Sequence, residues 1–450
     1  MDAISSAQPK RRWPSVLALA AAAFVDSSEN QALSILWPRM YPALGLRAGQ
    51  LGPVLGISDL IRTLTLPFWG WAADRFSRKA LLVGITGFWG GWTLVIAFVH
   101  SFSQLLSVRI LSSLGLGVLW PTAFSLLSDL FESRRRGTAA GIMTAVSYIG
   151  TVTAFLILPM LAGLSPDSWR LGFIAMGVAS ILTGFLLLIL HEPPRGAAEP
   201  ELSDVISAEA AARYAFRVRD LPAIARVRSW WVLLLQNSVD NIAMAILFGW
   251  AFVWLDSLGL GDQAFIAVVL LTLGTLTGHL FFGWLGDRLE RRHPTYGRAT
   301  MALTGLVLTA PALAAFILLG QSGFGPLMLF GALAGLGISS VDTGARWPMA
   351  QGVLRPELRA TGRAALDMVI GSVGSLMMTL SGSLVDAWGV TTMLLLLVPI
   401  PKLIAALLWL PMFRTYPADR AALHQVLAGR RQEMSGPGEK EPGASAQGRS

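Results

Sequence analysis

Long apolar segments separated by short polar ones run through most of the chain. A helix needs roughly 20 mostly apolar residues to cross about 30 Å of hydrocarbon, and twelve segments approach that length. We predict helices because an isolated strand cannot satisfy its backbone in lipid. The predicted spans are Pro14–Pro38, Leu51–Ala73, Ala80–His100, Gln104–Leu127, Thr138–Leu161, Leu171–Leu190, Trp231–Leu255, Ala264–Gly286, Ala299–Gly320, Leu329–Leu354, Ala364–Val385 and Thr391–Phe413.

A polar motif repeats after the second and the eighth span. Both copies read Gly-Trp-x-x-Asp-Arg-x-x-Arg, beginning at Gly70 and at Gly283, 213 residues apart. A Trp-Pro pair recurs in the fourth and tenth spans, at Trp120 and Trp347. The repeats predict two related six-helix halves. The expected organisation is an N-terminal tail (1–13), one bundle (14–190), a cytoplasmic linker (191–230), a second bundle (231–413) and a disordered tail (414–450).

Composition agrees with an all-α polytopic membrane protein. The chain is 54% hydrophobic and 14% charged, against about 25% charged in an average globular chain. It has no cysteine, which excludes disulfides and thiolate metal sites, and we expect no metal and no cofactor. The net charge of +8 comes from short basic clusters between apolar runs, so we expect the lipid bilayer and no nucleic acid as a partner.

Basic residues also predict the orientation. With the N-terminus inside, the inner loops and tails hold 28 of the 35 basic residues, the outer loops three and the spans four. Cytoplasmic loops are enriched in Lys and Arg, so both termini are expected in the cytoplasm. Only four of the 35 are lysine, a usage common in GC-rich bacteria, which suggests a bacterial inner membrane. Twelve helices form a complete unit, so we expect a monomer.

The repeated loop resembles the hallmark loop of the major facilitator superfamily, and the resemblance covers Pro14 to Phe413. It departs from the usual pattern at Ala72, Ser77 and Glu290. The resemblance implies two six-helix bundles that rock about a central site, with the loops latching the halves in the outward-open state. The glycines also permit close helix contact. The residues expected to form this gate are Gly70, Asp74, Arg75, Arg78, Gly283, Asp287, Arg288 and Arg291.

Three acids inside the spans are candidates for proton coupling. A charge at the bilayer centre costs about 2.5–3.5 kcal/mol, so such groups usually face a cavity or a partner. Asp26, Glu29 and Asp240 have no obvious cation on their own helices. Asp26 precedes Asp74 by 48 residues and Asp240 precedes Asp287 by 47, so these two acids occupy near-equivalent positions in the halves.

Other polar residues in the spans are candidates for substrate binding. The resemblance implies that spans one, four, seven and ten line the cavity. The candidates there are Arg346, Asp342, Arg109, Asn241 and Gln236. Each has an alternative: Asp342 and Arg346 as a satisfied pair, and Arg109 as a side chain that snorkels to the interface. For Asp59 with Arg62 we expect packing or an outer gate, for Lys402 snorkelling, and for His279 packing.

These observations favour a secondary active transporter of a small organic solute. We expect proton-coupled uptake (symport) by rocker-switch alternating access, with an organic anion as the candidate substrate. The alternative is a proton-driven exporter of drugs or lysolipids, but span five lacks the Gly-Pro-x-x-Gly-Gly pattern of drug antiporters. The Glu expected in span four of spinster-like lysolipid carriers is also missing. A non-transporting sensor is a further alternative, and no motif indicates an enzyme.

Overall fold

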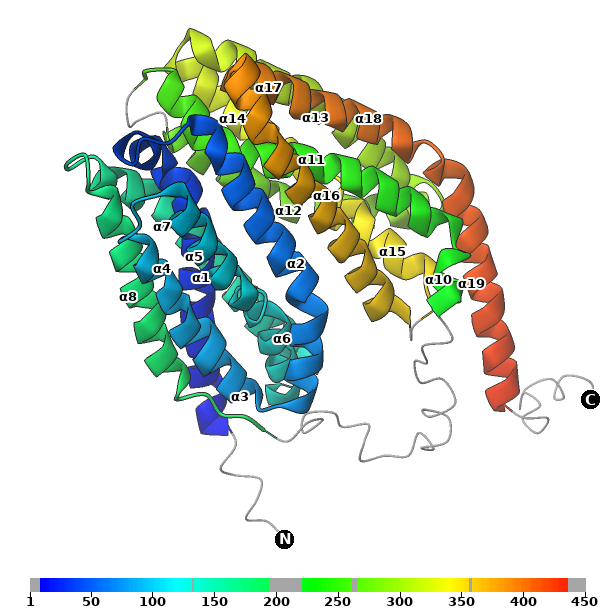
Figure 1. The fold of residues 1–450 in the computed structure, drawn as a ribbon. Helices are drawn as coiled ribbons and strands as arrows, with labels where there is room; N and C mark the ends of the chain where they lie inside the picture. Colours follow the sequence, from blue (N-terminus) through cyan, green and yellow to red (C-terminus); the bar gives the residue numbers. More distant parts are fainter. Residues whose placement is uncertain (1–8, 132, 194–220, 261–264, 356–357, 436–450) are drawn as a thin grey trace, which may run out of the picture.

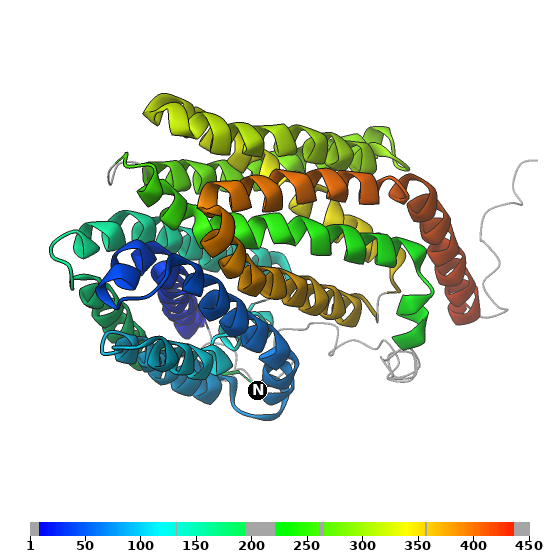
Figure 2. The ribbon, with the colours of Figure 1, turned by 45° about the horizontal axis from the view of Figure 1, so that its top comes forward.

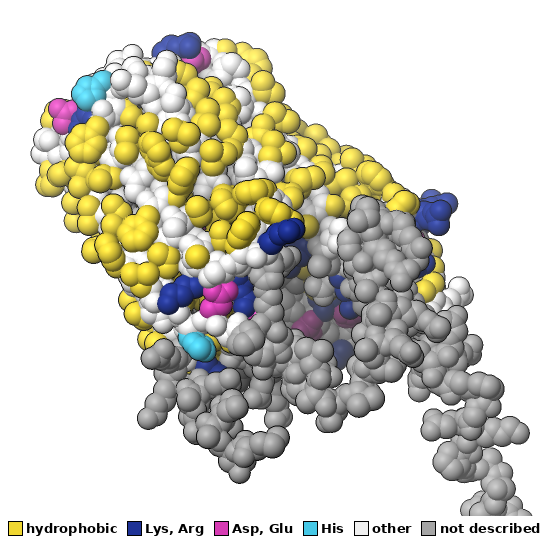
Figure 3. Space-filling model, turned by 60° about the horizontal axis from the view of Figure 1, so that its bottom comes forward, with side chains coloured by type: hydrophobic (Ala, Val, Ile, Leu, Met, Phe, Trp, Pro, Cys, Tyr) yellow, Lys and Arg dark blue, Asp and Glu magenta, His cyan; other side chains and the backbone are white. Residues whose placement is uncertain are grey.

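The computed structural model describes residues 9–131, 133–193, 221–260, 265–355 and 358–435. Within these ranges every regular element is a helix, which confirms the all-α prediction. Twelve helical segments correspond to the predicted spans, and nine of those described are long and apolar enough by themselves to cross a membrane. Hydrophobic side chains cover the flank of the molecule in Figure 3, and charged ones gather toward its ends.

The N-terminal half, blue to green in Figure 1, contains the first six segments. Two of them are assembled from shorter helices, α3 to α4 and α5 to α6. The helices are α1 (Pro9–Ala43), α2 (Leu51–Arg75), α3 (Arg78–Leu81), α4 (Trp92–Ile96), α5 (Phe102–Gly115), α6 (Leu119–Leu130), α7 (Ser133–Ala162) and α8 (Trp169–Leu187).

The C-terminal half, green to orange, contains the other six. A short helix precedes it and a long one follows it, and its tenth and twelfth segments are each built from two helices. The helices are α10 (Leu221–Ala225), α11 (Arg228–Ser257), α12 (Ile266–Arg292), α13 (Gly297–Leu319), α14 (Phe324–Ile338), α15 (Trp347–Val353), α16 (Arg359–Trp388), α17 (Val390–Leu397), α18 (Pro399–Trp409) and α19 (Met412–Ser435).

The tenth segment is interrupted between α14 and α15 by a π-helical turn, Asp342–Arg346. Its wider hydrogen bond runs from the Arg346 N–H to the Val341 carbonyl over 2.7 Å. Pro348 has no N–H, so it cannot bond the Gly344 carbonyl one turn earlier. Pro348 therefore leaves the Gly344 carbonyl without its usual donor from within the helix. The widened turn carries two candidate site residues, Asp342 and Arg346.

The C-terminal tail departs from the prediction. We expected disorder from residue 414, but α19 continues to Ser435 and the chain beyond lies outside the described residues. Tertiary contacts stabilise this helix: Tyr416 is buried, and Asp419 accepts hydrogen bonds from the N–H (2.7 Å) and hydroxyl (2.6 Å) of Ser229. Composition could not reveal these partners. Most of the predicted linker, 194–220, also lies outside the described residues.

The halves meet at one side of the molecule, through α2 and α16. We call this the outer side, because the loop charges predict it to face away from the cytoplasm. Glycines bring the two helices together: the backbone of Gly49 and Gly52 lies so close to Gly382 that neither position has room for a side chain. Asp386 accepts the Gly49 N–H (3.0 Å) and pairs with Arg47 (2.9 Å). Both contacts connect the halves.

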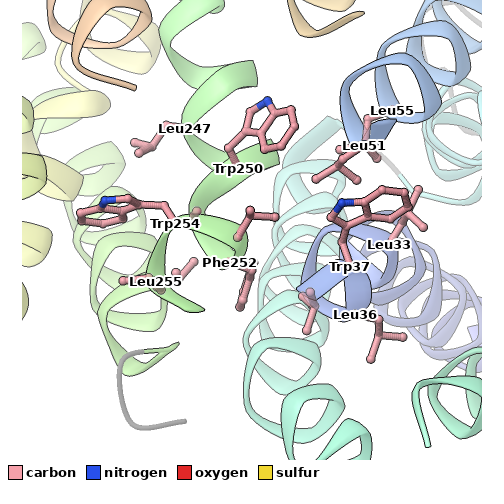
Figure 4. Close-up of a cluster of buried hydrophobic side chains, with 14 of the residues drawn as sticks. Leu33, Leu36, Trp37, Leu51, Leu55, Leu247, Trp250, Phe252, Trp254 and Leu255 are labelled. Atoms are coloured by element: carbon pink, nitrogen blue, oxygen red, sulfur yellow. The ribbon is translucent and has the colours of Figure 1, made fainter. Parts of the chain in front are cut away.

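Large apolar side chains seal the same side. Figure 4 shows Trp37 and Leu51 of the N-terminal half near Trp250 and Phe252 of α11. The ring of Phe252 also lies 5.2 Å from that of Phe155 on α7. Toward the opposite, inner side, where α1 begins and α19 ends, the halves diverge in Figures 1 and 2. The two halves are thus in contact at the outer side and separate toward the inner side.

We predict that Gly52→Val shifts the molecule toward an outward-open state. A Cβ atom at Gly52 would lie 2.7 Å from the Gly382 nitrogen and 2.8 Å from the Met378 carbonyl oxygen, so the outer ends must separate. Because the chain lacks cysteine, spin labels can be attached at introduced cysteines alone.

Labels at Ala43→Cys and Ala387→Cys, near the outer ends of the two halves, would report the change as a longer distance. Gly141→Val is the matched control, since a Cβ atom there meets nothing within 4 Å. Equal label distances in the Gly52 and Gly141 variants would contradict the assignment of this contact as the outer closure.

Candidate functional site

Asp26 and Glu29 lie one turn apart on α1 and face into the N-terminal half. With Ser112 and Ser180 they line a cavity of about 10 Å³, which is close to the space that one water molecule needs. Glu29 is 3% exposed, and its Oε1 has no hydrogen-bond partner among the described residues. A buried acceptor without a partner is costly, so this pair is a candidate for binding a proton.

Arg109 on α5 lies beside this group. It is 3% exposed and close enough to Glu29 and Asp59 for favourable charge interactions. The idea that Arg109 snorkels to the interface is therefore wrong, because nearby carboxylates attract the guanidinium group inward. Arg109 does not line the two larger cavities described next, so its predicted substrate contact is not seen in this conformation.

A cavity of about 380 Å³ lies between the two halves. It is within the usual size range of small-molecule sites, about 300–1,000 Å³. Its walls come from α1, α2, α11 and α16, so it spans both halves below the outer closure. The lining residues are Asn30, Gln31, Ser34, Leu55, Asp59, Arg62, Thr63, Asn241, Met244, Ala245, Phe248, Gly249, Gly371, Gly374, Ser375 and Met378.

A second cavity, of about 200 Å³, extends into the C-terminal half. It shares Asn241, Met244 and Phe248 with the first cavity and also contains Asp342 and Arg346. These α11 positions are three or four residues apart, so they lie on one helix face. Three residues predicted to bind substrate therefore line the same cavity: Asn241 on α11, and Asp342 and Arg346 on the π-helical turn.

Arg346 is less available to a substrate than the sequence suggested. It pairs with Asp342, donates to Asn237 Oδ1 over 3.0 Å and lies 4.5 Å from the centre of the Trp347 ring. The structure contains the Asp342–Arg346 pair given above as the alternative, but the buried Arg346 Nε has no hydrogen-bond partner among the described residues. Asn237 was missed by the sequence analysis, although the spacing of the α11 face includes it.

Gln236 and Asp240 are buried polar residues of α11, and their partners cannot be predicted from the sequence of that helix alone. Gln236 is buried, lines neither of the two larger cavities and has no hydrogen-bond partner for its amide atoms among the described residues. Asp240 pairs with Lys402 of α18 over 2.7 Å. Lys402 is 1% exposed, so the expectation that it snorkels is wrong. The cation that Asp240 lacks on its own helix comes from a distant span.

The first gating loop is held by an ion cluster at the inner side. Arg78 is buried, pairs with Asp129, and lies 3.4 Å from Glu192. Glu192 in turn accepts the Arg78 N–H over 2.8 Å and the Ser77 hydroxyl over 2.5 Å. Partial burial raises the pKa of Glu192, but these hydrogen bonds and that of the Lys79 N–H outweigh it, and the pKa is lowered overall.

The second gating loop has a similar hub built on a different arginine. Arg298, at the start of α13, pairs with Asp287 and with Glu290 (2.6 Å). It also donates to the Gly344 carbonyl over 2.6 Å, the group that Pro348 leaves free. This hub therefore connects the loop to the widened turn of the tenth segment. The repeated motif aligns Arg291, not Arg298, with Arg78 of the first loop. The second loop is longer, so Arg298 falls outside the motif.

The other predicted gate residues have different surroundings in this conformation. Arg75 and Arg288 lie over the rings of Trp71 and Trp284, at 5.8 and 5.6 Å from the ring centres. Arg291 is exposed, and the side chain of Asp74 lies outside the described part of the chain. A Cβ atom added at Gly70 or Gly283 would meet nothing within 4 Å. The close helix contact expected of these two glycines is therefore not present among the described residues in this conformation.

Comparison with known proteins agrees with this fold. Residues 19–296 match the family model of the Major Facilitator Superfamily. The chain is 26% identical to Protein spinster of Drosophila melanogaster over 300 residues, which cover 64% of this chain but only 47% of that protein. It is also 26% identical to the 3-(3-hydroxy-phenyl)propionate transporter of Escherichia coli (strain K12), covering 79% of this chain and 82% of that protein.

A solved structure has the same architecture. It is a bacterial homologue of the human lysosomal transporter Spinster in an inward-facing and unoccupied conformation. The two structures superpose with a TM-score of 0.80 over 92% of this chain and 99% of that one, at 20% sequence identity. At this identity the similarity establishes the fold alone.

We predict that Asp240→Asn strongly destabilises the protein. The substitution leaves the buried Lys402 ammonium without its carboxylate, and removing one partner of a buried pair costs about 3–5 kcal/mol. Thermal unfolding in detergent would measure the loss. The double variant Asp240→Asn/Lys402→Met should recover most of the stability, and a double variant no more stable than the single one would contradict the pairing.

Proposed function

The chain belongs to the Major Facilitator Superfamily, and we propose that it moves a small organic anion across a bacterial inner membrane by alternating access. The observation that carries this proposal is the cavity of about 380 Å³ between the halves. It is lined from both halves and lies below the outer closure, so separating the outer ends and joining the inner ones would expose it to the other side. We further propose a monomer with both termini in the cytoplasm.

Two features support an anion as substrate. Arg62 lines the larger cavity and Arg346 the smaller one, and guanidinium groups bind carboxylates in a planar, bidentate way. The E. coli relative is a 3-(3-hydroxy-phenyl)propionate transporter, so an aromatic carboxylic acid is the first class to test. The family and its named relatives are transporters rather than enzymes, which agrees with the motif analysis.

Proton coupling is assigned to Asp26 and Glu29. Both are buried next to a water-sized cavity, and Arg109 lies close by. A proton taken up by Glu29 would remove its attraction for Arg109 and so change the balance of charge around α5. Asp240, the third acid predicted to couple protons, is engaged by Lys402 and enters the proposal only as part of that pair.

The gating loops would act as the inner latch. In the inward-open conformation each hub lies within one half, Arg78 with Asp129 and Arg298 with Asp287. Closing the inner side would bring the two loops together. Arg298 also donates a hydrogen bond to the Gly344 carbonyl. Movement of the second loop would therefore displace the π-helical turn that carries Arg346.

Uptake by proteoliposomes tests the proposal. Vesicles containing the full chain should accumulate radiolabelled 3-(3-hydroxyphenyl)propionate when the external pH is lower than the internal pH, and should lose the accumulation when an uncoupler collapses the gradient. Accumulation of lysolipids or cationic drugs, with none of the acid, would favour the exporter alternative and contradict the anion proposal.

We predict that Glu29→Gln abolishes uphill accumulation but retains exchange. The amide cannot carry a proton, so the gradient no longer drives uptake, while substrate exchange requires no net proton movement. Counterflow in the same vesicles measures exchange separately. Asp167→Asn, which removes an acid that is 76% exposed, is the matched control. Normal pH-driven accumulation by Glu29→Gln would remove Glu29 from the coupling mechanism.

A further inference from the structure

We propose that Arg62 binds the carboxylate of the transported anion and that Asp59 is the internal carboxylate which the substrate displaces. This inference rests on the proposed function, and it assigns recognition to a residue that the sequence had suggested for packing or an outer gate. Arg62 and Asp59 lie one turn apart on α2, and both line the cavity between the halves.

The geometry of Arg62 leaves it open to a ligand. Its Nη2 lies 3.1 Å from Asp59 Oδ1, and the two side chains are 36% and 43% exposed. A guanidinium group has five N–H donors, and within the described residues this ion pair is the side-chain contact that the structure gives Arg62. Arg62 lines the cavity between the halves and is partly exposed, so an incoming carboxylate could accept hydrogen bonds from two of its N–H groups.

The other two arginines inside the spans are engaged or remote. Arg346 is held by Asp342, Asn237 and the face of Trp347. Arg109 is almost fully buried beside Glu29 and does not line the cavity between the halves. A substrate carboxylate bound at Arg346 would have to compete with three existing contacts, whereas at Arg62 it competes with one direct contact, the ion pair with Asp59, and with the longer-range attraction of Asp26.

The existing competitor is weak. An exposed ion pair contributes little to stability, and here the contact is a single nitrogen with a single oxygen. A bidentate carboxylate makes two charge-assisted hydrogen bonds. A substrate carboxylate would therefore replace one hydrogen bond to Arg62 by two, and Asp59, which the buried Arg109 also attracts, would cover the arginine charge when the carrier is empty.

The opposite wall of the cavity indicates the rest of the substrate. Phe248 and Met244 of α11 and Met378 of α16 provide an apolar surface, and Asn241 provides an amide. A ligand that joins Arg62 to this wall would touch both halves. This lining favours a monocarboxylate with an aromatic or similarly flat apolar body and one polar group within reach of Asn241, whose Nδ2 also donates to the Ile370 carbonyl over 3.1 Å.

Binding to the full chain in detergent tests the assignment by isothermal titration. The probes are 3-(3-hydroxyphenyl)propionate and its neutral amide, which has the same shape without the charge. Arg62→Gln should weaken binding of the acid by about tenfold or more, as expected for a charged hydrogen bond of about 1.5–3 kcal/mol, and should leave the amide unaffected. Asp59→Asn should tighten binding of the acid by about two- to fivefold.

Two further variants distinguish the possible failures. Arg292→Gln removes the same charge from an exposed position at the inner end of α12 and should bind the acid as the unaltered chain does. If Arg346→Gln loses the acid while Arg62→Gln binds it normally, the assignment of Arg62 is wrong but an anion site remains. If the unaltered chain binds the amide as well as the acid, or binds neither, the proposed function itself is contradicted.

The two α2 variants are expected to change the affinity for the acid in opposite directions, which distinguishes the proposed effect from misfolding. A damaged protein would lose affinity in both, whereas displacement of Asp59 requires loss in Arg62→Gln and gain in Asp59→Asn. Weaker binding of the acid by a well-folded Asp59→Asn protein would overturn the displacement step, because Asp59 would then assist the ligand rather than compete with it.

Discussion

A charged side chain inside the hydrocarbon layer needs a partner or water, since its burial alone costs several kcal/mol. Most of the intramembrane charges meet this need within one half. Asp240 pairs with Lys402 and Arg346 with Asp342. Two groups differ: the Asp26 and Glu29 pair beside a water-sized cavity, and Arg62, which pairs with Asp59 but is still 36% exposed. These two exceptions are the places where a proton and an anion would bind.

The same constraint links the site to the gate. Pro348 deprives the Gly344 carbonyl of its helical partner, and Arg298 supplies the missing donor from the inner loop. The residue that satisfies a backbone group near the cavity is thus also the centre of the loop hub. At the outer side, glycines of α2 and α16 allow the two backbones to come into contact. The closure therefore depends on close packing of the helices more than on ion pairs.

The sequence was sufficient for features that depend on local pattern. Hydrophobic length predicted the spans, and the repeated loop predicted the two halves. It was insufficient where partners come from distant spans: nothing local connects Lys402 to Asp240 or Asp419 to Ser229. The sequence predicts packing or an outer gate for Arg62, and the substrate role proposed here depends on which face of α2 meets the second half, which the sequence does not show. Arg298 was missed because the loop before it is longer than in the first half.

A structure of the full chain determined with 3-(3-hydroxyphenyl)propionate would test the central claim most directly. We predict ligand density in the cavity between the halves, with the carboxylate against Arg62 of α2 and the ring against Phe248 of α11, and with Asp59 turned away. Density confined to one half, or a cavity that stays empty at saturating ligand, would contradict a substrate site shared by the two halves.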